Sequence, residues 1–307
     1  MAHIVLVAIA ALSAALSNVP LTSGALPPDE PTPETLATLR DRALRMTVAT
    51  QVNGRGPYSF TIDTGADRSV VSDRLASELA LPPSGSVLMH GIIDAQPVRT
   101  VTVDRLVIGR TERRGIAAPV LPEPSLGATG LLGLDALANQ NIILDFKRHR
   151  ITIASSHADD AGDPETITVT GRSKFGQLVL TDASIGTRKI YAIIDTGAQT
   201  TVANPVLRKL LLGSPVLRTT GAELIGVTGS VIPAEFGSVP RIRLGGMTLT
   251  NMPVAYADAH TFKKFGVDKV PAILVGMDVL AGFERVAVDF RRRQVRFLVG
   301  DGAIGRG

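Results

Sequence analysis

The sequence contains the same five residues, Ile-Asp-Thr-Gly-Ala, twice, at 62–66 and at 194–198. Each copy follows a β-rich run, a short glycine-containing turn and a second β-rich run, which is the pattern of a hairpin. A second pair of landmarks follows, with Leu-Leu-Gly-Leu-Asp within 130–137 and Leu-Val-Gly-Met-Asp within 272–280. The landmarks keep the same order in both halves, so the sequence predicts two related units.

The two copies differ in length between their landmarks. Asp63 and Gly133 are 70 residues apart, whereas Asp195 and Gly276 are 81 apart, so the second copy carries about eleven extra residues. Short β-like runs broken by glycine and proline dominate both copies, which indicates a mainly β fold. We expect one lobe over 45–154, a polar linker over 155–170, a second lobe over 171–299 and a tail over 300–307.

Each lobe is expected to hold one short helix directly after its Gly-x-Asp. In this interpretation Asp135 and Asp278 are helix N-caps, which accept hydrogen bonds from the exposed amides of the first turn.

The N-terminal segment is expected to be separate from both lobes. Residues 4–16 form an apolar run of about 13 residues, shorter than the roughly 20 that a membrane span needs. Such a run is typical of a signal peptide, here over 1–25, and predicts an exported protein, periplasmic or secreted. Residues 1–3 contain no lysine or arginine, so an uncleaved membrane anchor or a misassigned start stay open as alternatives. Residues 26–44 are expected to form a proline-rich linker and a short helix over 35–44.

Composition excludes several kinds of chemistry. The chain has no cysteine, which rules out disulfides, thiol nucleophiles and cysteine-ligated metals. None of the five histidines has the spacing of a known metal motif, so we expect neither metal nor cofactor. The 32 basic and 28 acidic residues give a net charge of +4, too small to predict nucleic-acid binding. The longest basic run, 291–293, is expected to be solvent-exposed.

The repeated motif places an aspartate where an isolated anion would be costly. Asp63 and Asp195 each follow an apolar run, and burial of an unpaired carboxylate is unfavourable. Gly65 and Gly197 permit a sharp turn and a close approach of another chain segment. If the copies pack about a pseudo-two-fold axis, the two carboxylates face each other.

Paired in this way, the motifs could hydrolyse an amide without metal or thiol. The hydroxyls of Thr64 and Thr196 can bond across a symmetric junction. Two carboxylates within a few ångström share one proton, because both cannot ionise. The charged one can act as general base for water, while the protonated one donates to a substrate carbonyl.

Two simpler interpretations of the repeated motif are possible. Aspartate and glycine are common turn residues, but two Asp-Thr-Gly sequences in matched contexts have a chance probability on the order of a few tenths of a per cent. The chain could also be a duplicated fold that has lost activity, although neither copy has lost its Asp, Thr or Gly.

The two motifs resemble the active-site motif of aspartic proteases. Residues 131–133 and 274–276, two hydrophobic residues and a glycine, resemble that family's second signature, a ψ-shaped loop beneath each aspartate. Alanine after the glycine and the compact copies are more similar to retropepsins than to pepsins. The chain is therefore identified as a single-chain tandem retropepsin-like protein of the kind found in bacteria.

The resemblance implies a fold, an activity and a set of residues. It implies two β-barrel lobes related by pseudo-two-fold symmetry, and an aspartic endopeptidase acting as a monomer on peptide or protein. Asp63 and Asp195 would be catalytic. Supporting positions would be Thr64, Gly65, Ala66, Thr196, Gly197, Ala198, Gly133 and Gly276.

The resemblance also implies flaps, which are hairpins that close over substrate. Candidates lie at 89–92 and 225–229, with His90, Gly91, Gly226 and Val227 as substrate-binding residues and glycines suited to a mobile tip. A loop histidine without such contact is the alternative for His90.

The chain departs from the family pattern at two places. The flap tyrosine of pepsins is absent. The Arg-Asn that follows the second signature in retroviral enzymes is replaced by 134–135 and 277–278, so Asp67 is expected to lack an arginine partner.

Ala66 and Ala198 predict the pH range of activity. Both lack the hydroxyl that stabilises the carboxylate in pepsin-like sites, and loss of a hydrogen bond to the charged form raises a pKa. We therefore expect an optimum in the weakly acidic to neutral range.

Two other readings of function stay open. The protein could be a non-catalytic exported module that binds a peptide or cell-wall fragment. Alternatively, each copy could pair with another chain, although the linker is long enough for pairing within one chain.

Overall fold

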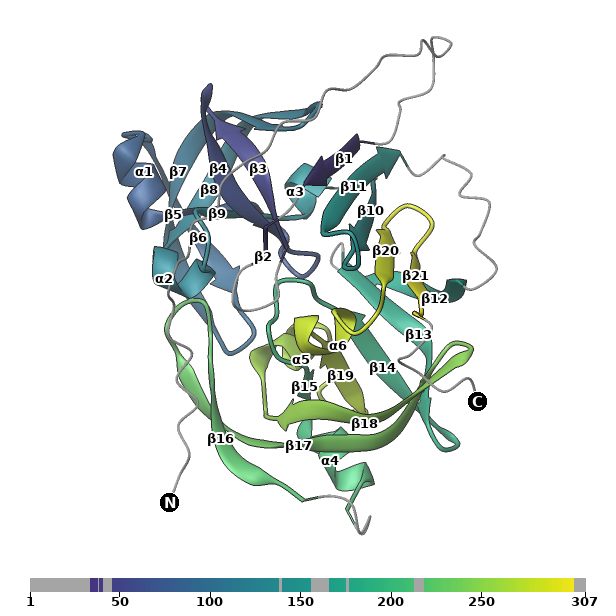
Figure 1. The fold of residues 1–307 in the computed structure, drawn as a ribbon. Helices are drawn as coiled ribbons and strands as arrows, with labels where there is room; N and C mark the ends of the chain where they lie inside the picture. Colours follow the sequence, from purple (N-terminus) through teal and green to yellow (C-terminus); the bar gives the residue numbers. More distant parts are fainter. Residues whose placement is uncertain are drawn as a thin grey trace, which may run out of the picture.

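The structure, a computed structural model, describes residues 34–37, 39–40, 46–137, 140–155, 166–174, 177–212 and 218–300. Strands dominate the described chain, which confirms the mainly β prediction. Figure 1 shows two lobes, the first coloured purple to teal and the second green to yellow. The expected signal peptide, most of the linker and nearly all of the tail lie outside the described residues, so those predictions stay untested.

Each lobe is a curved sheet with the same strand order. The first has the order β2-β3-β4-β9-β5-β8-β7-β6, and the second repeats it as β13-β14-β19-β15-β18-β17-β16. Pairing of β3 with β7, and of β13 with β17, closes each sheet toward a barrel. The strands of the first lobe are β2 (Leu39–Arg40), β3 (Met46–Val52), β4 (Arg55–Ile62), β5 (Val70–Ser72), β6 (Pro83–His90), β7 (Ala95–Ile108), β8 (Thr111–Leu121) and β9 (Gly130–Leu132). Those of the second are β13 (Gln177–Ile185), β14 (Arg188–Ile194), β15 (Val202–Ala203), β16 (Thr220–Ile225), β17 (Val231–Leu244), β18 (Met247–Tyr256) and β19 (Ala272–Val275).

A further antiparallel run of strands joins the lobes, in the order β1-β11-β10-β20-β21-β12. Its centre is the pairing of β10 with β20, where Ile143 faces Ala287. Each copy supplies one half of this run, so the two lobes are related by an approximate two-fold axis through the β10–β20 pair. The strands are β1 (Glu34–Ala37), β10 (Gln140–Asp145), β11 (Arg150–Ser155), β12 (Thr166–Lys174), β20 (Arg285–Asp289) and β21 (Gln294–Leu298).

The helix expected over 35–44 is wrong where the structure describes it. Residues Glu34–Ala37 and Leu39–Arg40 are strands β1 and β2, paired with β11 and β3. Backbone pairing with an open sheet edge outweighs the weak helical preference of the local sequence. Residues 166–170, expected in the linker, belong to β12 for the same reason, because they complete the opposite edge.

The described chain contains three short helices in each lobe rather than one. Two of them, α3 (Leu134–Leu137) and α6 (Met277–Leu280), are the helices expected after the Gly-x-Asp. Ser72 caps α1 (Asp73–Glu78), and Asn204 caps α4 (Pro205–Leu210), each through a side-chain oxygen. The remaining two are α2 (Glu123–Leu126) and α5 (His260–Lys264).

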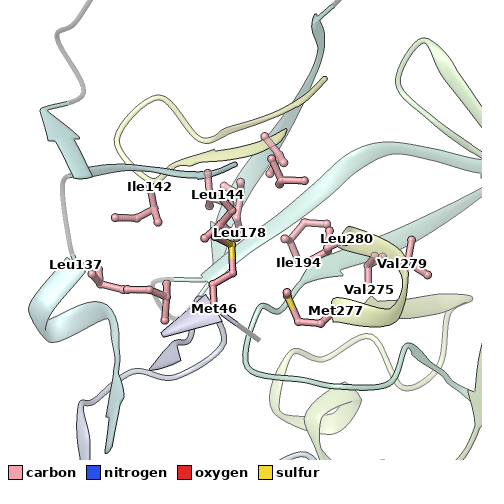
Figure 2. Close-up of a cluster of buried hydrophobic side chains, with 14 of the residues drawn as sticks. Met46, Leu137, Ile142, Leu144, Leu178, Ile194, Val275, Met277, Val279 and Leu280 are labelled. Atoms are coloured by element: carbon pink, nitrogen blue, oxygen red, sulfur yellow. The ribbon is translucent and has the colours of Figure 1, made fainter. Parts of the chain in front are cut away.

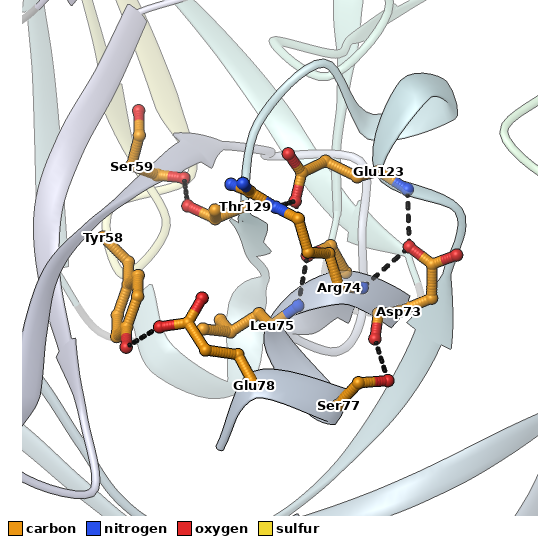
Figure 3. Close-up of polar contacts among 10 residues, drawn as sticks. Tyr58, Ser59, Asp73, Arg74, Leu75, Ser77, Glu78, Glu123 and Thr129 are labelled. Atoms are coloured by element: carbon orange, nitrogen blue, oxygen red, sulfur yellow. Dashed lines mark hydrogen bonds and ion pairs between the residues drawn. The ribbon is translucent and has the colours of Figure 1, made fainter. Parts of the chain in front are cut away.

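Polar contacts fix α1 and α2 on the outside of the first barrel, as Figure 3 shows. The Tyr58 hydroxyl donates to Glu78 at 2.8 Å, and Arg74 Nε donates to Glu123 at 2.9 Å. The Glu123 amide donates to Asp73 Oδ1 at 3.0 Å. Such exposed contacts are worth about 0–1 kcal/mol each, so they orient these helices more than they stabilise the lobe.

One buried hydrophobic cluster runs from the first lobe through the joining strands into the second. Figure 2 shows β10 residues packed between side chains of both lobes. Each fully buried side chain of this kind contributes about 1.5–3 kcal/mol, so the lobes stabilise each other through a shared core. The labelled members are Met46, Leu137, Ile142, Leu144, Leu178, Ile194, Val275, Met277, Val279 and Leu280.

The surface agrees with one further expectation. Residues 291–293 form the exposed turn between β20 and β21, as predicted for the basic run. Within the described ranges, no helix has the length and apolar character needed to cross a membrane.

Candidate active site

Each repeated aspartate stands at the end of a central strand. Strand β4 ends at Ile62, directly before Asp63, and β14 ends at Ile194, directly before Asp195. The Asp63 amide donates to the carbonyl of Leu132 at 3.0 Å, and the corresponding bond from the Asp195 amide is 3.1 Å long. Strands β9 and β19 lie parallel to these strands on one side and antiparallel to β5 and β15 on the other. This is the ψ-shaped arrangement expected from the second signature.

The second-signature glycines lie against the backbone of the loop that follows each aspartate. A Cβ atom on Gly133 would lie 2.4 Å from the carbonyl carbon of Arg68, and one on Gly276 would lie 2.8 Å from that of Thr200. In both lobes the next amide donates to the carbonyl of the motif alanine, at 2.9 Å in the first and 2.8 Å in the second. Only glycine permits this approach, so the signature supports the loop rather than reaching the reacting atoms.

The prediction that Asp135 and Asp278 cap their helices is wrong. Each lies one residue inside its helix, and Gly276 occupies the N-cap position of α6. Asp135 Oδ1 accepts from the amide and hydroxyl of Ser69, at 2.8 and 2.6 Å. Asp278 Oδ1 accepts from Thr201 in the same way, at 3.0 and 2.6 Å. These carboxyl groups therefore connect the short helices to the two aspartate loops.

Two threonines join the loops across the junction. The Thr64 amide donates to Thr196 Oγ1 at 3.0 Å, and the Thr196 amide donates to Thr64 Oγ1 at 3.1 Å. The Thr64 hydroxyl donates to the carbonyl of Ile194 at 3.1 Å, and the Thr196 hydroxyl donates to that of Ile62 at 2.8 Å. The threonine side chains are almost fully buried, with 1% and 2% of their surface exposed. The network is symmetric and complete, which fixes the separation of the two loops.

The motif glycines bring each aspartate against the opposite loop. A Cβ atom on Gly65 would lie 2.5 Å from Asp195 Cγ, and one on Gly197 would lie 2.2 Å from Asp63 Cγ. Each glycine amide donates to the aspartate of its own loop, at 2.7 Å for Asp63 and 2.9 Å for Asp195. The two carboxyl groups are hydrogen-bonded to each other. A carboxylate pair of this kind holds one proton between its members.

The two members of the pair differ in their surroundings. Asp195 is 7% exposed, whereas Asp63 is partly accessible. Burial raises the pKa of Asp195, against the opposing effects of the Gly197 amide, the Asp63 carboxyl group, the Ala198 amide and the charge of Lys264. The cause of this shift is burial, so the effect expected from the missing hydroxyls of Ala66 and Ala198 stays a prediction.

Asp67 has a cationic partner that the sequence did not reveal. Lys264 Nζ, from α5 of the second lobe, donates to Asp67 Oδ2 at 2.8 Å, and the lysine side chain is only 14% exposed. Where the retroviral enzymes have an arginine partner for this residue, Asp67 here pairs with a lysine from the other lobe. No local pattern could have indicated it, because the two residues are 197 positions apart.

Both flap candidates lie at the tips of long hairpins, on the left of Figure 1. The first hairpin consists of β6 and β7, and the second of β16 and β17. The tips contact each other. The Thr228 hydroxyl donates to Asp94 at 3.2 Å, and the side chain of Gln96 donates to Ser230 at 3.1 Å. Ser230 also hydrogen-bonds to Asp94.

Each tip packs against the lobe opposite its own. Ile92 of the first hairpin packs on a cluster of the second lobe that contains Ala198. Val227 of the second hairpin packs on a cluster of the first lobe beside Ala66. The hairpins therefore cross and cover the loops that carry the aspartates. Gly91 and Gly226 begin the two turns, and the amide of each donates a hydrogen bond across its own turn at 2.8 Å.

The His90 side chain contacts a second histidine, in the other lobe. Its Nδ1 lies 2.9 Å from Nε2 of His260, the first residue of α5. Contact between His90 and substrate stays a prediction. Within the part of the chain that the structure describes, no group of three or more His, Asp or Glu side chains is arranged to hold a metal ion.

Two β lobes of equal topology, each contributing one aspartate to a threonine-linked junction, define a bilobal protein with a paired-carboxylate site. Residues 48–136 and 181–279 each match the aspartyl protease family model, and together they span more than half of the chain. The chain belongs to the aspartyl protease family, which confirms the resemblance. The two separate matches also fit an internal duplication. No curated protein matches the chain.

Proposed function

We propose that the protein is an aspartic endopeptidase that hydrolyses peptide bonds with a water molecule activated by Asp63 and Asp195. A reciprocal contact between the two motifs supports this proposal. Each carboxyl group lies against the glycine of the other motif, and the two groups are hydrogen-bonded. The hydrogen bonds of the two buried threonines hold the aspartate loops in these positions.

The proposed reaction uses the single shared proton. The charged carboxylate removes a proton from water as the water oxygen attacks the peptide carbonyl carbon. The protonated carboxyl group donates to the carbonyl oxygen, which gives a tetrahedral diol. The proton gained from water then passes to the amide nitrogen and the carbon–nitrogen bond breaks. At the same time the other carboxylate takes a proton back from a diol hydroxyl, so the pair again holds one proton.

The crossed hairpins support a peptide as substrate. They cover the aspartate loops and end in glycine-containing turns, so a chain bound between hairpins and carboxyl groups would be extended. Substrate is expected to enter when the hairpin tips separate. We propose a monomer, because both halves of the site come from one chain.

Loss of turnover in two matched variants tests this function. The full chain would be incubated with unfolded proteins over pH 3–8, with and without pepstatin, and the products identified by mass spectrometry. Asp63→Asn and Asp195→Asn should each lower the rate by at least about a thousandfold. Asp104→Asn, an exposed position on β7, should retain it.

The alternative is a non-catalytic module that binds a peptide or cell-wall fragment. It predicts no cleavage at any pH, together with peptide binding that survives either active-site substitution. Retained cleavage in Asp63→Asn or Asp195→Asn would contradict the proposed dyad.

We also propose that residues 1–25 direct export to the periplasm or medium. Mass spectrometry of the protein recovered outside the cytoplasm would show cleavage near 23–25. An intact N-terminus in a membrane fraction would instead favour an uncleaved anchor.

A further inference from the structure

The first hairpin is attached to α5 of the second lobe through a pair of histidines. His90 ends β6 and is exposed, and His260 begins α5 and is partly buried. Their ring nitrogens are 2.9 Å apart, and their rings lie within 11° of parallel with centroids 5.2 Å apart. The contact joins residues 170 positions apart in the sequence.

Two neighbouring contacts show that this attachment involves the hairpin tip as a whole. The Thr261 amide donates to the carbonyl of Ile92 at 3.1 Å. The Ile92 side chain packs on the cluster that contains Phe262 and Phe265, both on or next to α5. On the side of α5 the tip is thus held by an imidazole pair, a backbone hydrogen bond and an apolar contact, in addition to its hydrogen bonds with the second hairpin.

The same helix also holds the aspartate loop of the first lobe. Lys264, at the end of α5, pairs with Asp67, four residues after Asp63. Helix α5 therefore contacts both the hairpin and the loop between which substrate would bind. It lies in a long connection: residues 257–271 join β18 to β19, whereas residues 122–129 join β8 to β9. Most of the extra length of the second copy is found here.

The second hairpin shows no such polar attachment among the described contacts. Its Val227 packs on an apolar cluster that includes Leu126 of α2, the counterpart of α5. The two hairpins are therefore held differently against the opposite lobe: among the described contacts, an imidazole pair attaches the first hairpin but not the second.

We propose that His260 is a positioning residue of this site: it holds the first hairpin closed through its hydrogen bond to His90, and this hold is lost when both imidazoles are protonated. The effect on catalysis rests on the proposed peptidase function, whereas the effect on the hairpin does not.

The proton requirement follows from the geometry of the bond. One ring nitrogen must donate and the other must accept, so at least one imidazole must be neutral. A pair with one added proton still satisfies this. A pair with two has no acceptor and brings two positive charges together, so opening needs both protons and is steep in pH.

Burial and most of the charged groups around His260 lower its pKa and so disfavour its protonated form in the closed state. Burial lowers the pKa of His260 below its ordinary value of 6.5, and His90, Lys263 and Lys264 lower it further, while Asp94 raises it. Asp94 belongs to the first hairpin and accepts hydrogen bonds from Gln96 of the same hairpin and from Thr228 and Ser230 of the second. Asp258, before α5, pairs with Lys263 at 3.2 Å.

Closure of the first hairpin should depend on pH. A closed state with a lowered histidine pKa binds fewer protons than the open state, so closure is favoured above pH 6.5 and weakens as pH falls below it. Acidification should therefore release the first hairpin.

Hydrogen–deuterium exchange of the full chain tests the proposal without any need for turnover. The reporters are the amides of Gly91 and Thr261, which donate across the hairpin turn and to the hairpin, respectively. Exchange rates at pH 7.5 and pH 5.0 would be divided by the intrinsic rate at each pH, so that only the opening equilibrium remains.

Three variants separate the histidine bond from other causes. His260→Gln places an amide where Nε2 lies and cannot titrate. His260→Phe keeps the apolar contact and removes the bond. His149→Asn is the control, since His149 is exposed in the β10–β11 turn with φ of 52°, a conformation that asparagine tolerates.

In the wild type and His149→Asn, corrected exchange at both amides should rise at least about tenfold at pH 5.0. It should be independent of pH in His260→Gln and fast at both pH values in His260→Phe. If His260→Phe misfolds by circular dichroism, His90→Asn and His90→Leu form the equivalent pair. Preserved protection in the folded bond-deleting variant, or an unchanged pH response in the glutamine or asparagine variant, would overturn the proposal.

Kinetics on the same samples separates the two claims. If the protein cleaves peptides, His260→Phe should raise KM more than it lowers kcat at pH 7.5, because the hairpin binds substrate without reaching the reacting atoms. Hairpin release at low pH in a protein that cleaves nothing would retain the histidine proposal and reject the peptidase.

Discussion

Lys264 of the second lobe donates to Asp67 of the first at 2.8 Å, and the charge of this lysine lowers the pKa of Asp195. This ion pair lies beside the loop that carries Asp63 without belonging to the repeated motif. It shows that the two lobes, although alike in topology, give the carboxyl pair an asymmetric surrounding.

Removal of this charge should move the pH profile. Lys264→Met is expected to raise the pKa of Asp195, since the carboxylate loses a favourable positive charge. The charged form needed as base then appears only at higher pH, so the acidic limb of kcat/KM should shift upward. Lys264→Arg should keep the wild-type profile. Lys263→Met is the matched control, because that lysine pairs with Asp258 and is 54% exposed; an equal shift there would contradict a specific role for Lys264.

The threonine junction should contribute strongly to stability. Thr64→Val removes two hydrogen bonds and leaves the Thr196 amide and the Ile194 carbonyl unpaired in the interior. Each unpaired buried group costs about 1–3 kcal/mol, so unfolding in urea should show a loss of about 2–5 kcal/mol. Thr64→Ser keeps the hydroxyl and should lose about 1 kcal/mol or less. A valine variant as stable as the serine variant would mean that these hydrogen bonds contribute little at this position.

The motif glycines should be required for activity more than for folding. Gly65→Ala would place a methyl group about where the Asp195 carboxyl group lies, since an ideal Cβ is 2.5 Å from its Cγ. Displacement of a reacting group by about 1 Å can cost about a hundredfold in rate. We expect kcat/KM to fall at least that far while the circular dichroism spectrum is retained. Gly221→Ala, where an added Cβ meets nothing within 4 Å, is the control and should be fully active.

The sequence predicted those parts of the site that repeat. Asp63 and Asp195, their glycines and their threonines could be placed because two copies of one pattern imply a shared junction. Gly133 and Gly276 followed from the second pattern. Ser72 and Asn204 also carried readable N-cap signals for α1 and α4, which the one-helix expectation passed over.

The remaining features depend on contacts distant in sequence. Strands β1 and β2 form because open sheet edges at β11 and β3 accept them, which no local preference shows. Asp135 lies two positions beyond the N-cap position of its helix, and its partner Ser69 is 66 positions away. The contacts of α5 with His90 and Asp67 have no counterpart at α2 among the described residues, so the repeat gave no indication of them.

The motif alanines set the last expectation, on the pH of activity. In the second lobe the Ala198 amide donates to Asp195 Oδ1 at 3.2 Å, and a side-chain hydroxyl at this position is absent. Burial, which raises the pKa of Asp195, is therefore only partly offset, and we expect an optimum in the weakly acidic to neutral range.

Ala198→Ser tests the cause directly. The added hydroxyl would donate to the carboxylate, favour its charged form and lower its pKa, so the acidic limb of kcat/KM should move to lower pH. Ala117→Ser on β8 makes the same chemical change away from the carboxyl pair and should leave the profile in place. A wild-type profile that peaks in strong acid, or a serine variant whose acidic limb does not move, would show that the pair is controlled by something other than this missing hydrogen bond.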